Sequence, residues 1–139
     1  MLCKTAWRRG RLRILKEGDM KNYLFRGKHG GQWKIGSYAF YKGKHIIILP
    51  TTFNRYEIQY STLGLWSEHI DKNNKWIFDG DIVKDKNGVV FIISYEVREC
   101  RWVAWYANNP KQWEAFDKCF IDYHELEIIG NIHDDGVPA

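Results

Sequence analysis

Residues that favour β-strands far outnumber residues that favour helices in this chain. Val, Ile, Thr, Tyr, Phe and Trp total 47 of the 139 residues, whereas Ala and Leu, the best apolar helix formers, total 14. Turn sequences such as Lys42-Gly43 and Asp85-Lys86-Asn87-Gly88 separate the apolar runs, as hairpin turns do. This pattern predicts a mainly β fold of small twisted antiparallel sheets or a partly open SH3-like barrel, with at most one short helix.

The expected strands follow one another with short connections. In the run from Arg101 to Tyr106, alternation places Trp102, Ala104 and Tyr106 on one face of a strand. Asn109 followed by Pro110 has the form of a helix start, which predicts the one short helix at residues 110–118. The complete set of expected strands covers residues 23–26, 33–41, 44–49, 56–60, 76–78, 81–84, 89–95, 101–106 and 126–132.

The composition is that of a small globular protein. Hydrophobic residues make up 45% and charged residues 27% of the chain, which is too apolar for a disordered protein. The longest aliphatic run, Ile46 to Leu49, is far shorter than a membrane span, so we expect no membrane association. Three scattered cysteines argue against a disulfide scaffold or a zinc site and are typical of a reducing compartment, which predicts a cytoplasmic protein.

The excess positive charge lies at the start of the chain. Residues 1–19 contain six basic and two acidic side chains, a net charge of +4, while residues 20–139 contain 15 of each. Two interpretations of this segment stay open: a basic arm that touches nucleic acid or an anionic surface, or read-through of DNA upstream of the true start. The second fits Lys16-Glu17-Gly18-Asp19, which a purine-rich ribosome-binding sequence can encode, and it predicts that translation starts at Met20.

Two short motifs carry a family resemblance. Trp76-Ile77-Phe78-Asp79-Gly80-Asp81-Ile82-Val83-Lys84 resembles one hallmark of the prophage YopX protein family. Leu126-Glu127-Ile128-Ile129-Gly130-Asn131-Ile132-His133 resembles a second hallmark, close to the C-terminus. Tyr23 to Arg26 is similar to the usual start of family members, which supports Met20 as the initiator. The stretch at residues 62–71 is longer than in the family pattern, and Asn73-Asn74 replaces Asn-Gly, so the geometry of this loop is left open.

The resemblance implies an organisation and an origin but no chemistry. It divides the chain into the extension at residues 1–19, a YopX-like β domain at residues 20–135 and a C-terminal tail at residues 136–139. It implies a mainly β fold and an origin in a phage or prophage, hence the cytoplasm of a host bacterium. The family brings no assigned activity and no catalytic residues. We predict a structural role for the residues that match its motifs: Asp79, Gly80, Asp81, Ile82, Val83, Ile129, Gly130, Asn131 and Ile132.

Asp79, Asp81 and Asp85 form the densest group of carboxylates in the chain. Strand alternation would place Asp79 and Asp81 on one face, where they could hold a hard cation such as Mg²⁺ or Ca²⁺. Such a site usually needs more oxygen ligands than these. We therefore favour the other interpretation, in which Asp79-Gly80 shapes a turn and Asp81 accepts hydrogen bonds from backbone N–H groups at the start of a strand.

Histidines occur beside acidic residues at three places, and each could serve as a general base or a metal ligand. None has the spacing of a zinc protease, and solvated surface loops explain such clusters better. We therefore predict no catalytic residue, no metal and no cofactor, and we interpret Cys100 and Cys119 as core or near-surface residues. The three clusters are His69 with Glu68 and Asp71, His124 with Asp122 and Glu125, and His133 with Asp134 and Asp135.

Aromatic residues are unusually frequent, with seven Trp, eight Tyr and seven Phe. Most should build the core, which leaves a minority for a partner surface, and Trp102 and Trp105 are the candidates. The sequence therefore favours a non-enzymatic phage or prophage accessory protein that binds a protein partner of host or phage origin. Two alternatives stay open: a single-stranded nucleic-acid binder and a metal-dependent hydrolase around Asp79, Asp81 and a histidine. Self-association into a homo-oligomer is also open.

Overall fold

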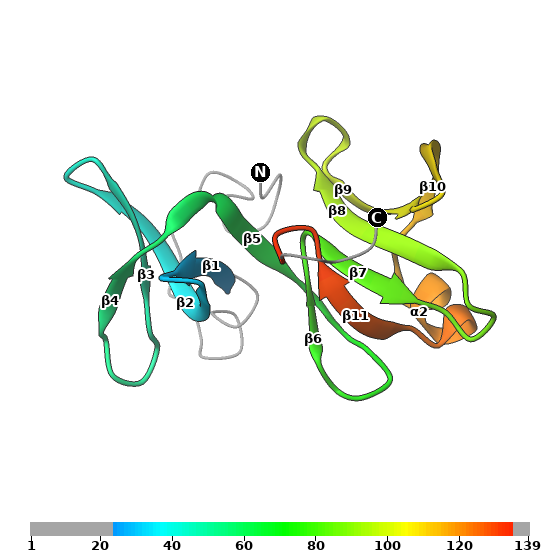
Figure 1. Cartoon of the computed structure of the whole chain (residues 1–139), viewed down its shortest axis with the longest axis horizontal. Helices are drawn as coiled ribbons and strands as arrows, with labels where there is room; N and C mark the ends of the chain where they lie inside the picture. Colours follow the sequence, from blue (N-terminus) through cyan, green and yellow to red (C-terminus); the bar gives the residue numbers. More distant parts are fainter. Residues whose placement is uncertain (1–23, 135–139) are drawn as a thin grey trace, which may run out of the picture.

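The computed structural model describes residues 24–134, which form two antiparallel β-sheets. Within these residues the sheets are not closed into a barrel and one α-helix accompanies them, so the predicted mainly β fold of small antiparallel sheets is confirmed. The sheets follow each other along the long axis of the molecule (Figure 1). The basic extension at residues 1–19, the expected start at Met20 and the tail at residues 136–139 lie outside the described residues.

The first sheet has six strands in the order β4-β3-β2-β1-β5-β6. Its first part is a set of consecutive hairpins, and Lys42 and Gly43 form one turn with φ angles of 51° and 77°. Two positive φ angles in a two-residue turn match the right-handed twist of the flanking strands. The strands are β1 (Phe25–His29), β2 (Gln32–Tyr41), β3 (Lys44–Ile48), β4 (Arg55–Glu57), β5 (Gln59–Ile70) and β6 (Trp76–Phe78).

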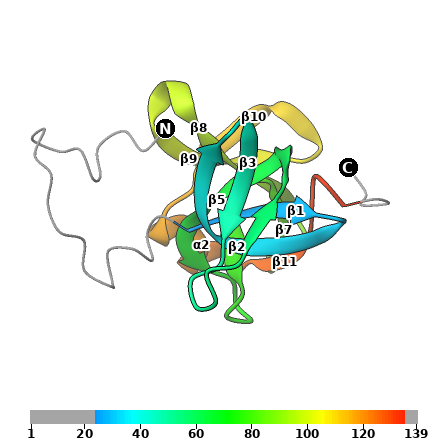
Figure 2. The ribbon, with the colours of Figure 1, turned by 90° about the vertical axis from the view of Figure 1, so that its left-hand side faces the viewer.

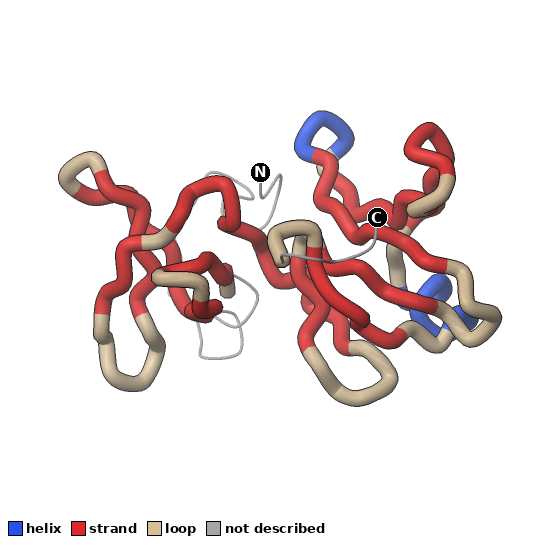
Figure 3. The backbone as a smooth tube through the Cα atoms, in the orientation of Figure 1, coloured by secondary structure: helices blue, strands red, loops and turns tan. Residues whose placement is uncertain are grey.

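The second sheet has five strands in the order β10-β9-β8-β7-β11 and is covered on one side by the α-helix α2 (Lys118–His124). Figure 2 looks along the long axis and shows β2 and β3 in front of the second sheet. Figure 3 shows how little of the described part of the chain is helical: α2 and the short 3-10 turn Val97–Glu99 interrupt a fold made of strands. The strands are β7 (Asp81–Lys84), β8 (Val90–Glu96), β9 (Arg101–Tyr106), β10 (Asn109–Ala115) and β11 (Glu127–Asn131).

The main hydrophobic core lies between the second sheet and α2. Phe91 of β8 is fully buried, and its ring meets the Phe120 ring of α2 at 5.1 Å between centroids. As expected, Trp102, Ala104 and Tyr106 share a face of β9 and pack into or against this core. Its buried members are Ile77, Val83, Phe91, Ile93, Ala104, Phe116, Phe120 and Leu126. Since Ile77 belongs to β6, the last strand of the first sheet also completes the core of the second.

The predicted helix at residues 110–118 is wrong in its position. Asn109 accepts a hydrogen bond from Lys111 N through its side chain and opens β10 instead of a helix. Trp113 of β10 pairs with Trp105 of β9, and this pairing buries part of both rings. The cross-strand contact favours a strand over a helix at these residues. The helix begins after Asp117, whose carboxylate accepts a hydrogen bond from Phe120 N at 2.9 Å. Within residues 24–134, no helix is long and apolar enough to span a bilayer.

The strands at residues 25–70 also differ from the prediction. β1 runs through Gly27 to His29, and the expected strand at residues 56–60 is split by Ile58 between β4 and β5. The stretch at residues 62–71, whose geometry the sequence left open, belongs almost entirely to β5. β5 escaped prediction because Gly64 interrupts its apolar pattern and Glu68 has a φ of +69°. β5 pairs with β1 along one edge and with β6 along the other, within the first sheet.

Candidate functional site

The two family-like motifs meet at one corner of the second sheet. Asn131 of β11 lies opposite Asp81 of β7, and Ile132 N donates a hydrogen bond to Gly80 O at 2.9 Å. Gly80 N donates to Ile93 O at 2.7 Å, which ties the same turn to β8. Gly80 has a φ of +92°, a conformation that only glycine adopts without strain. Segments about 50 residues apart in the sequence therefore form one rigid corner.

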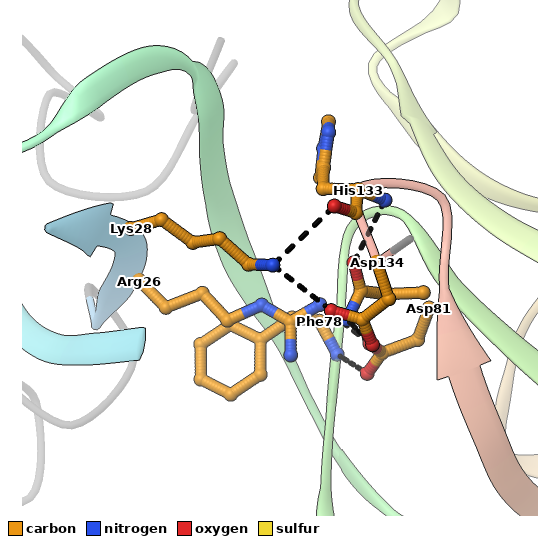
Figure 4. A network of polar contacts seen from close by, with 7 residues as sticks. Arg26, Lys28, Phe78, Asp81, His133 and Asp134 are labelled. Carbon is orange, nitrogen blue, oxygen red and sulfur yellow. Dashed lines mark hydrogen bonds and ion pairs between the residues drawn. The ribbon is translucent and has the colours of Figure 1, made fainter. Parts of the chain in front are cut away.

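A buried ion pair fastens the first sheet to this corner (Figure 4). Arg26 Nη2 of β1 lies 2.5 Å from Asp81 Oδ1, and the two side chains are only 10% and 1% exposed. Asp81 Oδ2 accepts a hydrogen bond from Phe78 N at 2.8 Å, so the carboxylate both pairs with Arg26 and holds the turn. The Arg26 guanidinium also lies over the rings of Trp33 and Phe78, at 4.1 and 4.7 Å from their centroids.

A second ion pair lies beside the first. Lys28 Nζ donates to Asp134 Oδ1 at 3.0 Å and to His133 O at 3.3 Å (Figure 4). Asn131 Nδ2 donates to Asp134 Oδ2 at 2.8 Å, which places Asp134 for this contact. Burial and the charges of Arg26 and Lys28 lower the pKa of the His133 imidazole, which keeps it neutral near pH 7. Arg26 and Lys28 therefore join β1 to β7 and to the segment after β11, through the carboxylates of Asp81 and Asp134.

The three carboxylates considered for a cation have different partners. Asp81 pairs with Arg26, while Asp85 Oδ1 accepts hydrogen bonds from Asn87 N and Val89 N, both at 2.8 Å. Asp85 Oδ2 lies 2.9 Å from His124 Nδ1. Asp79 Oδ1 accepts a long hydrogen bond of 3.4 Å from Tyr95 N. Across residues 24–134, no group of three His, Cys, Asp or Glu side chains has the arrangement of a metal site.

The histidine clusters are dispersed in the same way. The His69 ring meets the edge of Phe116, while Asp71 Oδ1 accepts hydrogen bonds from Asn73 N and Lys75 N. His124 pairs with Asp85 and not with its sequence neighbours Asp122 and Glu125. The remaining members lie at the surface or in turns: Glu68, Asp122, Glu125 and Cys119 are exposed, and Asp135 lies outside the described residues.

The predicted binding tryptophans lie on opposite faces of β9. Trp102 is half-buried against the core, with its ring 5.4 Å from the Tyr95 ring. Trp105 is half-buried on the other face and meets the Trp113 ring at 6.4 Å. Trp113 is 37% exposed and lies under the Arg101 guanidinium. The two residues therefore do not contribute to one common surface.

A pocket between the two sheets is the site that the sequence did not reveal. Its volume is about 380 Å³, and its walls come from β1, β2 and β5 on one side and from β8 and the turn after β6 on the other. Gly64 lets β5 approach that turn closely, because a Cβ atom there would lie 2.9 Å from Asp79 O. The lining residues are Phe25, Tyr38, Tyr60, Leu63, Gly64, Leu65, Asp79, Tyr95 and Val97. Tyr60, which is 60% exposed, ends the strand that the sequence predicted at residues 56–60, but nothing in the sequence showed that it lines a pocket.

Asp79 is the charged group in this otherwise apolar and aromatic wall. Burial raises the pKa of its carboxyl group to about 6, and the nearby carboxylates of Glu96 and Asp81 add to the increase. The hydrogen bond from Tyr95 N and the charge of Arg26 act in the opposite direction. A carboxylate held partly out of water at the edge of an apolar pocket interacts strongly with any charge that enters.

The architecture defines a class of small mainly β proteins: two open antiparallel sheets, joined by one buried and one partly exposed ion pair, with an aromatic pocket at their junction. The chain belongs to the YopX family, because the family model described as YopX protein matches residues 43–137. The matched part contains both motifs and the complete second sheet, whereas Phe25 and Tyr38 of the pocket precede it. No curated protein has a sequence that matches this chain significantly.

Proposed function

We propose that this chain is a non-enzymatic accessory protein of a phage or prophage, active in the host cytoplasm by binding a protein partner. The pocket at the junction of the two sheets is its docking site. The observation that carries this proposal is the aromatic wall of the pocket, which is open to solvent at Tyr60, a residue 60% exposed. Tyrosine is enriched where proteins bind one another, because it contributes a large contact area at a low entropy cost.

The aromatic wall is held by contacts within the protein. The Tyr60 ring stacks on the His45 ring at 4.0 Å, and His45 Nδ1 lies 2.6 Å from the Tyr38 hydroxyl oxygen. Tyr38 in turn packs against Phe25 at 5.8 Å. A preformed surface loses little conformational entropy on binding, so more of the contact energy contributes to affinity.

Three acidic side chains outside the pocket wall have structural partners, which supports structural roles for these three over catalysis. Asp81 is ion-paired with Arg26, Asp85 holds a turn and His124, and Asp134 pairs with Lys28. A general acid or base needs a proton that it can exchange with a substrate. These groups instead hold the sheets and turns in place.

The test is a pulldown from host lysate with the full chain, with and without nuclease, using Tyr60→Ala and Tyr123→Ala as variants. Tyr123 is a matched control, because it is 65% exposed and lies on α2 outside the pocket. We expect one protein to be retained after nuclease treatment, lost with Tyr60→Ala and kept with Tyr123→Ala. Partners that disappear with nuclease, or that bind Tyr60→Ala as well as wild type, would contradict the proposal.

A further inference from the structure

The chemistry of the pocket restricts what kind of group can enter it. Four aromatic rings line its walls, from Phe25, Tyr38, Tyr60 and Tyr95, together with the aliphatic side chains of Leu63, Leu65 and Val97. The faces of aromatic rings carry partial negative charge and attract cations within about 6 Å. A pocket with this lining therefore accepts an apolar stem and favours a positive charge at its end.

The charged groups around Asp79 also favour the entry of a positively charged group. When Asp79 is ionised, three carboxylates, those of Asp79, Asp81 and Glu96, influence this position against the single guanidinium of Arg26. Arg26 is already committed, because its Nη2 lies 2.5 Å from Asp81 Oδ1. The position thus has an excess of negative charge that an entering cation would offset.

Asp79 itself is poorly satisfied by the protein. Its Oδ1 accepts a hydrogen bond of 3.4 Å from Tyr95 N, which is long for such a contact. Carboxylates that serve only the fold, such as Asp81 and Asp85, accept backbone hydrogen bonds of 2.8 Å. Asp79 therefore gains more from a further donor than the other two carboxylates do.

We infer that the pocket takes the side chain of a lysine or arginine from the partner protein, with the Asp79 carboxylate as its counter-charge and the aromatic rings around its stem. This inference rests on the proposed function and names the chemistry of the partner's contact. Lysine and arginine both combine an aliphatic stem of three or four carbons with a terminal cation, which matches the apolar walls and the acidic end.

The test compares two probes that differ only in charge. The ¹⁵N-labelled full chain is titrated at pH 7.5 with Nα-acetyl-lysine amide and with Nα-acetyl-norleucine amide. The norleucine probe has the same four-carbon stem without the ammonium group. We expect saturable shifts at the amides of Gly64, Asp79 and Tyr95, and a Kd for the lysine probe at least tenfold lower. Asp79→Asn should bring the two Kd values together, and Asp122→Asn, an exposed carboxylate on α2, should leave their ratio unchanged.

The pH dependence of binding of the lysine probe distinguishes the effect of Asp79 from that of the other titratable groups near the pocket. As Asp79 takes up a proton below about pH 6, the lysine probe should bind more weakly in wild type but not in Asp79→Asn. The other titratable groups near the site are Asp81, Glu96, His45, Tyr38, Tyr60 and Tyr95, with Arg26 as a fixed charge, and all are present in both proteins. Equal binding of the two probes by wild type, or an unchanged lysine preference in Asp79→Asn, would overturn the inference.

The outcomes distinguish this inference from the proposed function. If the lysine preference is absent while Tyr60→Ala still abolishes partner binding, the pocket binds a protein through other chemistry and the inference alone fails. If Asp79 selects lysine while Tyr60→Ala keeps every partner, the pocket binds cations but is not the docking site for a protein. In that case the proposed function fails.

Discussion

Asp79 and Asp81 are two residues apart in the chain, and their carboxylates have different partners. Asp81 faces the first sheet, where Arg26 and Phe78 N satisfy both of its oxygens. Asp79 faces the pocket, where burial disfavours its charged form. Burial raises the pKa of the Asp81 carboxyl group as well, so the two carboxylates differ in their partners: Asp81 has a buried cation and a short backbone hydrogen bond, whereas Asp79 has one long hydrogen bond.

The raised pKa of Asp79 predicts how the free energy of unfolding depends on pH. Its pKa of about 6 in the folded protein lies above its ordinary value of 3.8, so its contribution to stability is present below pH 3.8 and is lost as the pH rises through 6. The difference corresponds to about 3 kcal/mol at 1.36 kcal/mol per pKa unit, which exposure to water in the pocket reduces to about 1–2 kcal/mol. Asp79→Asn should therefore stabilise the protein relative to wild type at pH 8 but not at pH 4.

Urea unfolding at pH 4, 6 and 8 measures this difference in the free energy of unfolding. Asp122→Asn is the control, because this exposed carboxylate pairs only with Lys118 on the same helix and should change the stability by less than about 0.5 kcal/mol. A stability difference between Asp79→Asn and wild type that does not change with pH would show that burial leaves Asp79 unperturbed.

At the scale of elements, β1 and β7 are held together by the pair of Arg26 and Asp81. Replacing one partner of a buried pair leaves an uncompensated charge, which typically costs about 3–5 kcal/mol. We expect Arg26→Met and Asp81→Asn each to lose stability of this order. The double variant should lose at least about 2 kcal/mol less than the sum, because no charge remains unpaired and the introduced amide oxygen still accepts the hydrogen bond from Phe78 N.

The exposed pair of Lys118 and Asp122 provides the matched double-mutant cycle. Both side chains are more than half exposed, so the coupling of Lys118→Met with Asp122→Asn should stay below about 1 kcal/mol. The coupling energies of the two cycles, obtained from urea unfolding, are then compared. If the changes in the free energy of unfolding caused by Arg26→Met and Asp81→Asn are strictly additive, the two charges do not stabilise each other.

The sequence predicts elements with local signals better than elements that depend on distant partners. Lys42-Gly43 and Asp85 to Gly88 mark their hairpins directly, and the flanking strands lie within a residue of their expected bounds. The helix was misplaced because Asn109-Pro110 resembles a helix start, whereas the pairing of Trp113 with Trp105 decides for a strand. β5 could not be predicted, because its course is set by pairing with both β1 and β6.

At the scale of the whole molecule, the pocket exists only because the two sheets are joined. Its walls come from residues as far apart as Phe25 and Val97, and no short motif connects them. From the sequence, two of the many aromatic residues, Trp102 and Trp105, were the candidates for a partner surface. The structure instead gathers aromatic residues from four strands around Asp79. Sequence patterns report the strands, while the site depends on how the sheets meet.

Site-specific photocrosslinking tests most directly whether this junction is the docking site. The photoreactive residue p-benzoylphenylalanine replaces Tyr60 at the rim of the pocket, or Tyr123 on α2 as the control, in the full chain. We expect a single nuclease-resistant product in host lysate from position 60, absent from position 123, and attached to the partner beside a lysine or arginine. A partner that crosslinks equally from both positions, or no product from position 60, would contradict it.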